Sequence, residues 1–400
     1  MSEPSIAGRL GENELRYVME VLRTEFRSSQ GSTMMRRVED AFGRKFGSKF
    51  AISFINGTAT MHAALEAWGI GPGDEVIVPP LTMSATTFAV LQANATPVFA
   101  DVEPDTFQIS ADSIEKCITT RTKAIITVAL YGLSPDMAPI MALAAKFGLK
   151  VIEDDAQCFL AKYRGKLVGT LGDCGSFSFQ SSKHMTSGEG GMVITDDATF
   201  AENLRRVQSL GYAGVSATKG KISKRDIQDP DYSRHISLGW NYRMPELCAA
   251  VALAQLESLD ELVEARVRSA KLFAQVADSH KWLRPQQVPA DCSHSYWTWV
   301  AVLDRQDIPW RDFRERFVEF GGDGIYAAWK LTYLEPMFRE LKLLGREKFI
   351  APELRDRYRL GLCPIAERLQ PRLLQFKTNY WDVSGAQRQA EVLDKTLRSF

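Results

Sequence analysis

Short apolar runs alternate with longer helical stretches between about residue 49 and residue 200, and this alternation constrains the fold more than any other feature. Each run is rich in Val, Ile or Phe and is bounded by Gly, Pro or Asp, which is typical of buried strands. The seven runs are residues 49–55, 75–78, 97–101, 124–130, 150–152, 175–179 and 191–195. Because parallel strands are joined by crossover helices, this pattern predicts an α/β fold with one large, mostly parallel sheet.

The rest of the chain predicts a second, smaller unit. Helical periodicity is clearest in residues 59–68, 136–147, 199–209 and 245–274. The last stretch is long and charged on one face, so we expect one helix that leads out of the large domain. Strand candidates such as 296–303 then mix with helices such as 310–320, which favours an α+β unit. We therefore place a large domain at residues 1–255 and a smaller C-terminal domain at 256–400, with a polar surface loop at 214–234.

Composition and charge exclude several classes of protein. Lys plus Arg and Asp plus Glu number 49 each, without a long block of like charge, so neither nucleic acid nor an anionic membrane is a predicted partner. The first residues lack a signal-peptide pattern, and no segment approaches the roughly 18 consecutive apolar residues of a membrane span. The six cysteines show no metal spacing and are expected to be reduced. We expect a cytoplasmic protein without a metal site.

Polar residues follow the first predicted strand at the edge where open parallel sheets bind ligands. Residues 56–59, Asn-Gly-Thr-Ala, open a helix whose free N–H groups and dipole favour a phosphate. Gly57 permits close approach of the backbone, and Thr58 adds a hydroxyl. A plain strand-to-helix turn with Thr58 as the N-cap explains the same residues about equally well.

Three consecutive acids, Glu153, Asp154 and Asp155, follow the fifth predicted strand. One of them should face the pocket, where a carboxylate can pair with a protonated pyridine nitrogen and keep the ring cationic. A solvated acidic turn is the better explanation for at least one of the three. Gln157, slightly further along, can hydrogen-bond a ring substituent.

Lys183 follows the sixth predicted strand, among small hydroxyl residues and before a Gly-rich turn. A surface charge explains this setting poorly. A desolvated lysine beside cationic groups has a lowered pKa and can form imines, as a Schiff-base nucleophile must. A tight turn into the seventh strand is the alternative explanation for residues 189–191, Glu-Gly-Gly.

Residues 177–179, Phe-Ser-Phe, with Lys183 and the run Thr-Ser-Gly-Glu-Gly-Gly at 186–191 resemble the lysine segment of one enzyme family. That family is the DegT/DnrJ/EryC1/StrS aminotransferases, which use pyridoxal 5'-phosphate (PLP) to aminate sugars. The agreement spans nearly the whole chain in family order. It includes residues 56–59, 71–79, 97–102, 122–125, 151–154, 241–244 and 363–368.

The resemblance implies a PLP enzyme of fold type I, and a homodimer whose active sites are shared between subunits. Lys183 would hold the cofactor as a Schiff base and pass an amino group from glutamate or glutamine to a keto sugar. Asp154 would pair with the pyridine nitrogen, with Gln157 close to the ring. The other implied contacts are Gly57, Thr58, Ala59 and Ser178 at the phosphate, Asn241 at the phosphate from the other chain, and Glu189 and Tyr131 at the substrate.

Three positions depart from the family pattern. Met83 stands where an aromatic residue usually stacks on the pyridine ring, and a thioether packs there more loosely. Asp155 replaces a small residue, and its charge should raise the local proton affinity if it faces inward. Ala129 replaces a histidine found in many members.

Several alternatives stay open. A dehydratase branch of the family carries His at the lysine position, whereas here Lys183 is in place and His184 lies one residue later. A non-catalytic regulatory module is disfavoured by Lys183 and Asp154. Gln180 and the residues at 186–189 also resemble the branch that aminates keto-cyclitols. We favour a nucleotide-linked keto sugar because such acceptors are commoner in the family.

Overall fold

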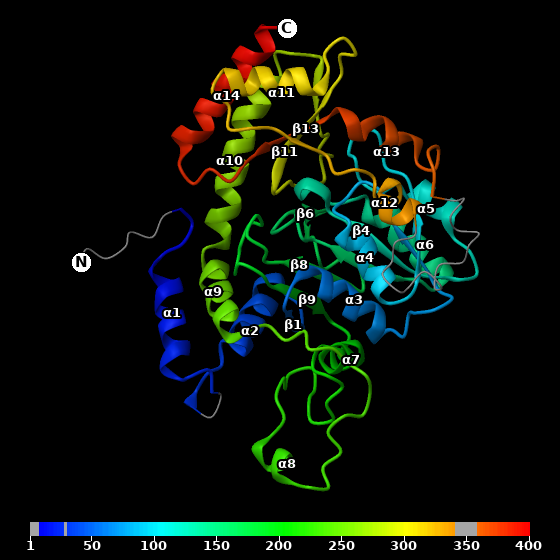
Figure 1. Ribbon diagram of the computed structural model, residues 1–400, viewed down its shortest axis with the longest axis vertical. Coiled ribbons are helices and arrows are strands. Elements are labelled where there is room, and N and C mark those ends of the chain that lie inside the picture. Colours follow the sequence, from blue (N-terminus) through cyan, green and yellow to red (C-terminus); the bar gives the residue numbers. More distant parts are fainter. Residues whose placement is uncertain (1–7, 28–29, 341–357) are drawn as a thin grey trace.

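The large sheet contains all seven predicted strands. The computed structural model describes residues 8–27, 30–340 and 358–400. The sheet order is β1-β9-β8-β5-β4-β2-β3, and only β9 runs antiparallel to its neighbours (Figure 1). The strands are β1 Phe50–Phe54, β2 Glu75–Val78, β3 Thr96–Phe99, β4 Thr122–Val128, β5 Lys150–Asp154, β8 Cys174–Ser178 and β9 Gly191–Thr195. The α/β prediction is confirmed.

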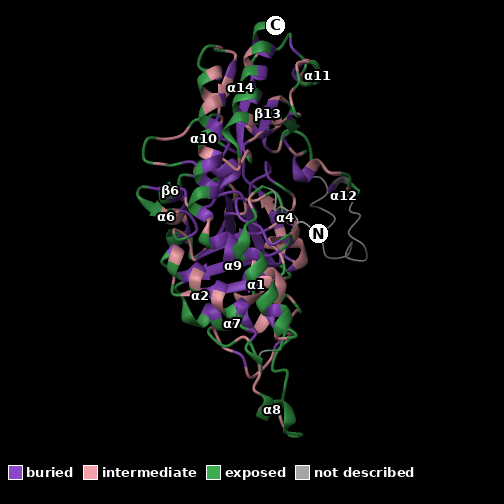
Figure 2. Cartoon of the chain, turned by 90° about the vertical axis from the view of Figure 1, so that its left-hand side faces the viewer, coloured by how far each residue is buried: buried purple, intermediate pink, exposed green. Residues whose placement is uncertain are grey.

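Helices cover both faces of this sheet, so its strands are buried on both sides (Figure 2). Apolar residues of α3, α4 and α7 pack on one face, and those of α1, α2, α5, α6 and α9 lie on the other. Burial on both sides explains why the strands read as continuous apolar runs. The helices are α1 Glu12–Arg23, α2 Met34–Phe46, α3 Gly57–Ala67, α4 Ala85–Gln92, α5 Ala111–Cys117, α6 Met137–Phe147, α7 Ala198–Gln208 and α9 Glu246–Glu257.

The single helix predicted at 245–274 is wrong, because the structure has two helices there. α9 ends at Glu257, and α10 spans Leu259–Ala277 with Ser258 between them. Ser258 is followed by Asp260 and Glu261, and a serine before acidic residues is a helix-start signal. α10 carries the chain away from the large sheet toward the smaller one (Figure 1).

A second sheet of four antiparallel strands follows, in the order β10-β11-β13-β12. Apolar side chains on one of its faces form a separate cluster with α10, α11 and α14, as the predicted α+β unit requires, while Val300, Val302 and Leu373 on the other face join the core of the large sheet. The division at residue 255 stays a prediction. The elements are β10 Leu283–Pro285, β11 Thr298–Leu303, α11 Trp310–Glu319, β12 Tyr326–Ala327, α12 Pro336–Arg339, α13 Pro364–Leu369, β13 Leu373–Lys377 and α14 Val383–Arg398.

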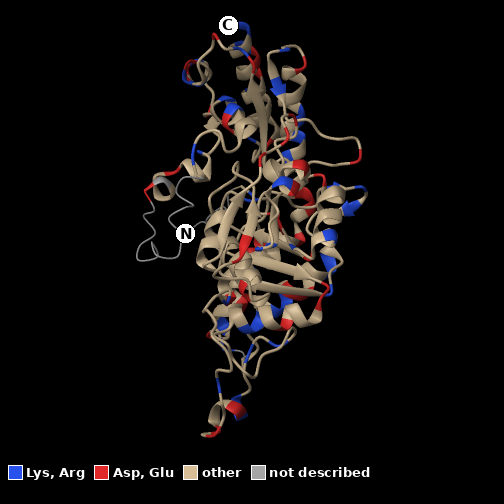
Figure 3. Cartoon of the chain, turned by 90° about the vertical axis from the view of Figure 1, so that its right-hand side faces the viewer, with Lys and Arg blue, Asp and Glu red and all other residues tan. Residues whose placement is uncertain are grey.

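Two irregular regions complete the fold. The loop predicted at 214–234 projects from the body and contains one short helix, α8 Lys224–Gln228 (Figure 1). A small hairpin, β6 Lys162–Tyr163 with β7 Lys166–Leu167, follows β5. Basic and acidic residues are interspersed over the outer helices (Figure 3). Within the described ranges, no helix is long and apolar enough to span a membrane.

Candidate active site

The turn after β1 lies directly against the end of β8. Asn56 is the N-cap of α3, because its Oδ1 accepts a hydrogen bond of 2.8 Å from the backbone N–H of Ala59. Thr58 is therefore not the N-cap, and that alternative is wrong. A Cβ on Gly57 would lie 2.8 Å from the Cβ of Ser178, so only glycine fits without displacing the serine. Two residues predicted to hold phosphate thus meet at the start of an 11-residue helix.

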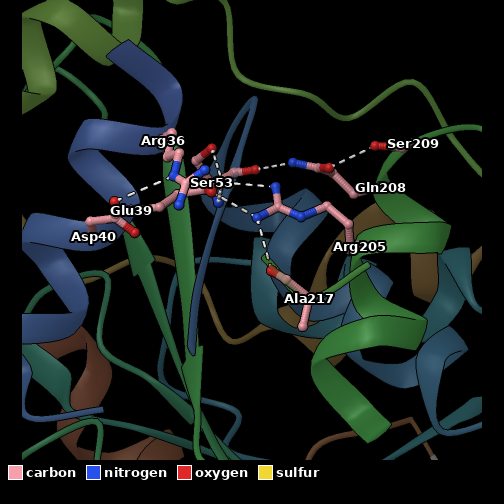
Figure 4. A network of polar contacts seen from close by, with 8 residues as sticks. All are labelled: Arg36, Glu39, Asp40, Ser53, Arg205, Gln208, Ser209 and Ala217. Carbon is pink, nitrogen blue, oxygen red and sulfur yellow. Dashed lines mark hydrogen bonds and ion pairs between the residues drawn. The ribbon is translucent and has the colours of Figure 1, made fainter. Parts of the chain in front are cut away.

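A buried polar network fixes β1 beneath this turn (Figure 4). Glu39 on α2 pairs with Arg205 on α7 through two contacts of 2.8 and 2.7 Å. The same carboxylate accepts hydrogen bonds from the backbone N–H and the hydroxyl of Ser53, at 2.9 and 2.8 Å. Gln208 donates to the carbonyl of Ser53. The strand end that leads to Gly57 is therefore tied to two helices.

The three acids after β5 have different partners, although all are buried. The carboxylate of Glu153 accepts from the backbone N–H groups of Gly169, Leu171 and Gly172, at 2.9, 2.6 and 2.7 Å. Burial nevertheless raises the pKa of Glu153 to about 7. A solvated acidic turn is therefore wrong for this segment.

Asp154 and Asp155 differ in what they face. Asp154 accepts from the hydroxyl of Thr86 at 2.8 Å and from the N–H of Ala156 at 3.2 Å. Burial raises the pKa of Asp154, while these bonds and the positive charge of Lys183 lower it. Asp155 is fully enclosed, and its carboxylate has no hydrogen-bond partner among the described residues. Burial, with the neighbouring acids Glu153 and Asp154, raises the pKa of Asp155 well above its usual range.

Gln157 and Tyr131 are joined beside these acids. The Oε1 of the buried Gln157 accepts from the backbone N–H of Tyr131 at 2.8 Å. Tyr131 has a φ of 65°, an unusual conformation for a bulky residue that this bond helps to hold. The Tyr131 side chain is fully buried, and its hydroxyl meets no hydrogen-bond partner in the described part of the chain.

Lys183 lies half-buried in the loop after β8, with its Nζ 4.7 Å from the centre of the Trp297 ring. The pKa of Lys183 is lowered to about 8, chiefly by burial. The carboxylate of Asp154 opposes this change, the guanidinium of Arg266 adds to it, and Glu189 opposes it weakly. An amine with this pKa is largely protonated at pH 7 but loses its proton readily.

The other predicted site residues are more exposed. Met83 is 47% exposed, and its Sδ accepts from the N–H of Ala85 at 3.0 Å. Glu189 and Asn241 lie on the surface. Asn241 forms a bridge with Ser209, and the carbonyl of the next residue, Tyr242, accepts from the N–H of Ile55 at 2.9 Å. The backbone at Asn241 and Tyr242 therefore lies next to the turn that contains Gly57.

A family model supplies the identification. The DegT/DnrJ/EryC1/StrS aminotransferase family matches residues 9–348. The chain belongs to this family. It is therefore a PLP-dependent aminotransferase of the sugar type, as the sequence resemblance predicted.

Named relatives of this aminotransferase include two kinds of sugar-related enzyme. A GDP-perosamine synthase of Caulobacter vibrioides is 41% identical over 74% of this chain and 76% of its own length. An L-glutamine:2-deoxy-scyllo-inosose aminotransferase of Streptomyces fradiae is 36% identical over 82% of this chain and 74% of its own. The solved aminotransferase from Psychrobacter cryohalolentis is 29% identical, with a TM-score of 0.83 over 99% of this chain and 98% of its own.

The residues of this aminotransferase fit PLP in three respects. The close contact of Gly57 with Ser178 brings a serine hydroxyl to a helix N-terminus, where a phosphate is favoured. The buried hydroxyl of Tyr131 lacks a partner within the described residues. Asp154 and Lys183 are close enough for the charge of each to shift the pKa of the other. PLP needs a site for its phosphate, a carboxylate for its pyridine nitrogen and an amine for its aldehyde, and these residues can supply all three.

Sequence reasoning missed three residues that hold the lysine segment. Arg266, Arg9 and Trp297 donate hydrogen bonds to backbone carbonyls between Ser181 and His184. Arg266 could have been found, because it lies on the apolar face of α10. The buried apolar residues of that face are Leu259, Leu262, Val263, Ala270 and Phe273. A charge on such a face signals a buried polar contact.

Proposed function

We propose that this aminotransferase transfers an amino group from glutamate or glutamine to a nucleotide-linked keto sugar, with Lys183 bonding covalently to PLP. The observation that carries the proposal is a half-buried lysine with a pKa of about 8 that senses the charge of Asp154. The relatives named GDP-perosamine synthase support a sugar carried on a nucleotide. The donor and the sugar belong to the proposal.

Each residue has a proposed task. Bound PLP supplies an electron sink that stabilises negative charge on the carbon next to the amino group. Asp154 keeps a proton on the pyridine nitrogen. Lys183, when it is free, moves a proton at its Nζ, for which a pKa close to the working pH is suitable. Gly57, Thr58, Ala59 and Ser178 would hold the phosphate, and Met83 and Gln157 would contact the ring. Glu189 and Tyr131 are proposed substrate contacts.

Borohydride reduction of the holoenzyme tests the assignment of Lys183. Reduction should fix a pyridoxyl group on the peptide that contains Lys183, and the visible absorbance band should disappear. Lys183→Ala is the control, and it should bind PLP without a borohydride-stable label. A label on another lysine would reject the assignment, and an unlabelled holoenzyme would reject covalent attachment altogether.

The acceptor has one rival class. Gln180 and residues 186–189 resemble the keto-cyclitol branch, and a relative named for 2-deoxy-scyllo-inosose is 36% identical. Candidate amino sugars and aminocyclitols can be tested in the reverse direction, by following amination of an α-keto acid. Turnover of nucleotide-linked amino sugars alone would support the proposal, whereas turnover of aminocyclitols alone would replace it.

We also propose a homodimer with a composite site, in which Asn241 of one protomer reaches the phosphate held by the other. The exposure of Asn241, Met83 and Glu189 supports an additional covering surface. In mixed dimers of Lys183→Ala and Asn241→Ala, one site of each pair would be intact. Refolding the two inactive variants together should restore roughly a quarter of wild-type sites. If complementation fails although Asn241→Ala alone is inactive, the shared site is rejected.

The cytoplasmic location also stays a proposal. The six cysteines, which all lie in described ranges, are free thiols, and this state fits a reducing compartment.

A further inference from the structure

Arg266 on α10 is a buried cation at the junction of the lysine segment and the smaller sheet. Only 1% of the residue is exposed. Its Nη2 donates to the backbone carbonyls of Ser182 and Lys183, at 2.9 and 3.1 Å. Its Nη1 donates to the carbonyl of Trp297 at 2.8 Å and to the hydroxyl of Thr378 at 3.2 Å. One planar group thus ties the lysine backbone to the residue before β11 and to the residue after β13.

The charge of Arg266 has no carboxylate partner within residues 8–27, 30–340 and 358–400. Its Nε has no hydrogen-bond acceptor there either. Burying a cation without a counter-ion is costly, since carbonyl oxygens replace only part of its hydration. Burial and the neighbouring Arg9 lower the pKa of Arg266 to about 9, so it remains charged at neutral pH.

The charge of Arg266 lies against the backbone of Lys183. Arg266 and Arg9 both bind the carbonyl of Lys183, and Arg9 also binds those of Ser181 and His184. Trp297 completes the enclosure, because its indole N–H donates to the carbonyl of Ser182 at 2.9 Å while its ring lies beside the lysine Nζ.

The charges that act on the lysine amine come from several elements. Asp154 on β5 and Glu189 after the lysine loop favour the ammonium form, whereas Arg266 on α10 opposes it. His184 next to the lysine is fully buried, and burial with the charge of Arg266 lowers its pKa well below the usual range. His184 is therefore neutral and adds no charge.

We propose that Arg266 is a positioning residue of the transamination site, which fixes the backbone of Lys183 through its guanidinium and places a positive charge without a carboxylate partner against the lysine segment. This inference rests on the proposed role of Lys183. It predicts two separable effects, one from the hydrogen-bonding fork and one from the charge. Arg266→Lys keeps the positive charge but loses the planar set of guanidinium N–H donors, which is called the fork below. Arg266→Gln keeps amide N–H donors but loses the charge.

The test measures Lys183 itself in the cofactor-free enzyme. Trace acetic anhydride is reacted at a series of pH values, and the labelling of the Lys183 peptide gives the titration of its amine. Arg266→Gln should raise the midpoint by about one pH unit, because a nearby like charge favours the neutral amine. Arg266→Lys should leave the midpoint near that of the wild type. Arg205→Gln is the matched control, since Arg205 is equally buried but pairs with Glu39.

The rate of backbone amide hydrogen exchange in the peptide of residues 181–185 tests whether the hydrogen bonds of the fork hold this segment. Both Arg266 variants should exchange there at least about tenfold faster than the wild type, because charged hydrogen bonds to the segment are lost or weakened. Arg205→Gln should not change exchange in this peptide relative to the rest of the protein. Unchanged exchange in both Arg266 variants would overturn the positioning role.

Two results would overturn the effect of the charge. One is an unchanged Lys183 midpoint in Arg266→Gln, and the other is an equal shift in Arg205→Gln. If Arg266→Gln does not fold, Arg266→Met serves as the second neutral variant, and an unchanged Lys183 midpoint there would equally overturn the effect of the charge. Covalent attachment of PLP is not involved in these measurements. Borohydride labelling can therefore reject the role of Lys183 while the link from Arg266 to its amine stands, and the reverse result is equally visible.

Discussion

Replacing Asp154 and Asp155 by asparagine, one at a time, separates a carboxylate that faces the lysine from one that is enclosed behind it. Both substitutions keep the size of the side chain and remove one potential charge. In Asp154→Asn, the amide oxygen can still accept from Ala156, and the hydroxyl of Thr86 can reverse and accept from the new amide. We therefore expect a stability loss of only about 1 kcal/mol.

The effect of Asp154→Asn on turnover should be much larger. The variant removes the charge proposed to hold a proton on the pyridine nitrogen, and loss of one such electrostatic group costs about 100- to 1000-fold in rate, or about 3–4 kcal/mol. Burial and the adjacent acids Glu153 and Asp154 raise the pKa of Asp155 well above its usual range, which favours its neutral form. Asparagine closely resembles a neutral carboxyl group, so Asp155→Asn should stay within about threefold of wild type.

The pH dependence of stability gives a second contrast. The folded state holds a proton on Asp155 that the unfolded chain releases above a pKa of about 3.9. The contribution of Asp155 is therefore most favourable at acid pH and is lost as the pH rises toward its folded pKa. Asp155→Asn removes this loss, so its stability relative to wild type should increase from pH 5 to pH 8 in urea unfolding. Equal or reversed losses of kcat/KM in the two variants would refute the assignment of Asp154.

Three further predictions concern the surrounding structure. Covalent capture of PLP by the apoenzyme should accelerate with pH around a midpoint of about 8, because only the neutral amine of Lys183 attacks. A midpoint near the ordinary lysine value of about 10.4 would contradict the effect of burial. Gly57→Ala should lower thermal stability by about 1–3 kcal/mol through its clash with Ser178, and the loss should shrink when measured in a Ser178→Gly background. Glu39→Gln should cost about 3–5 kcal/mol in urea unfolding, since buried Arg205 would lose its carboxylate, and a loss below about 1 kcal/mol would show that the pair is dispensable.

The sheet was predictable from the sequence because its strands are buried on both faces and end at turn residues. The same logic located Gly57, Asp154 and Lys183 at the carboxyl ends of β1, β5 and β8. The break at Ser258 was missed, since α9 and α10 follow each other with one residue between them and helical periodicity continues across it. The serine and the acidic residues that mark the start of α10 are a weaker signal than this continuous periodicity.

Contacts between distant segments were less accessible. The burial of the acid segment after β5 depends on the loop at 169–172, whose N–H groups bind Glu153, and no local pattern indicates this contact. Arg266 and Arg9 reach the lysine loop from positions more than 80 and 170 residues away in sequence. The role of an arginine on an apolar helix face becomes visible only when its acceptors are known.

Strand alternation explains why Asp154 alone among the three acids joins Lys183. Successive side chains of β5 point to opposite faces of the sheet, so Glu153 and Asp155 share one side and Asp154 takes the other. Ile152 packs on the face covered by α3 and α4, and Asp154, two residues later, bonds Thr86 of α4. Glu153 binds the N–H of Gly169, and a Cβ on that glycine would lie 2.9 Å from the Oδ2 of Asp155.

The same alternation operates in β8, where serines and phenylalanines take turns. Ser176 contacts Thr60 of α3 through hydroxyls 2.6 Å apart, and Ser178 lies against Gly57. Phe177 and Phe179 pack on the opposite face with Phe42 of α2. Asp154, the serines and the turn at Gly57 therefore gather in the layer of α3, where the lysine loop begins. The position of Asp154 along β5 thus decides which acid can serve the cofactor. Asp155 lies on the far side of the sheet, where burial raises its pKa and disfavours its charged form.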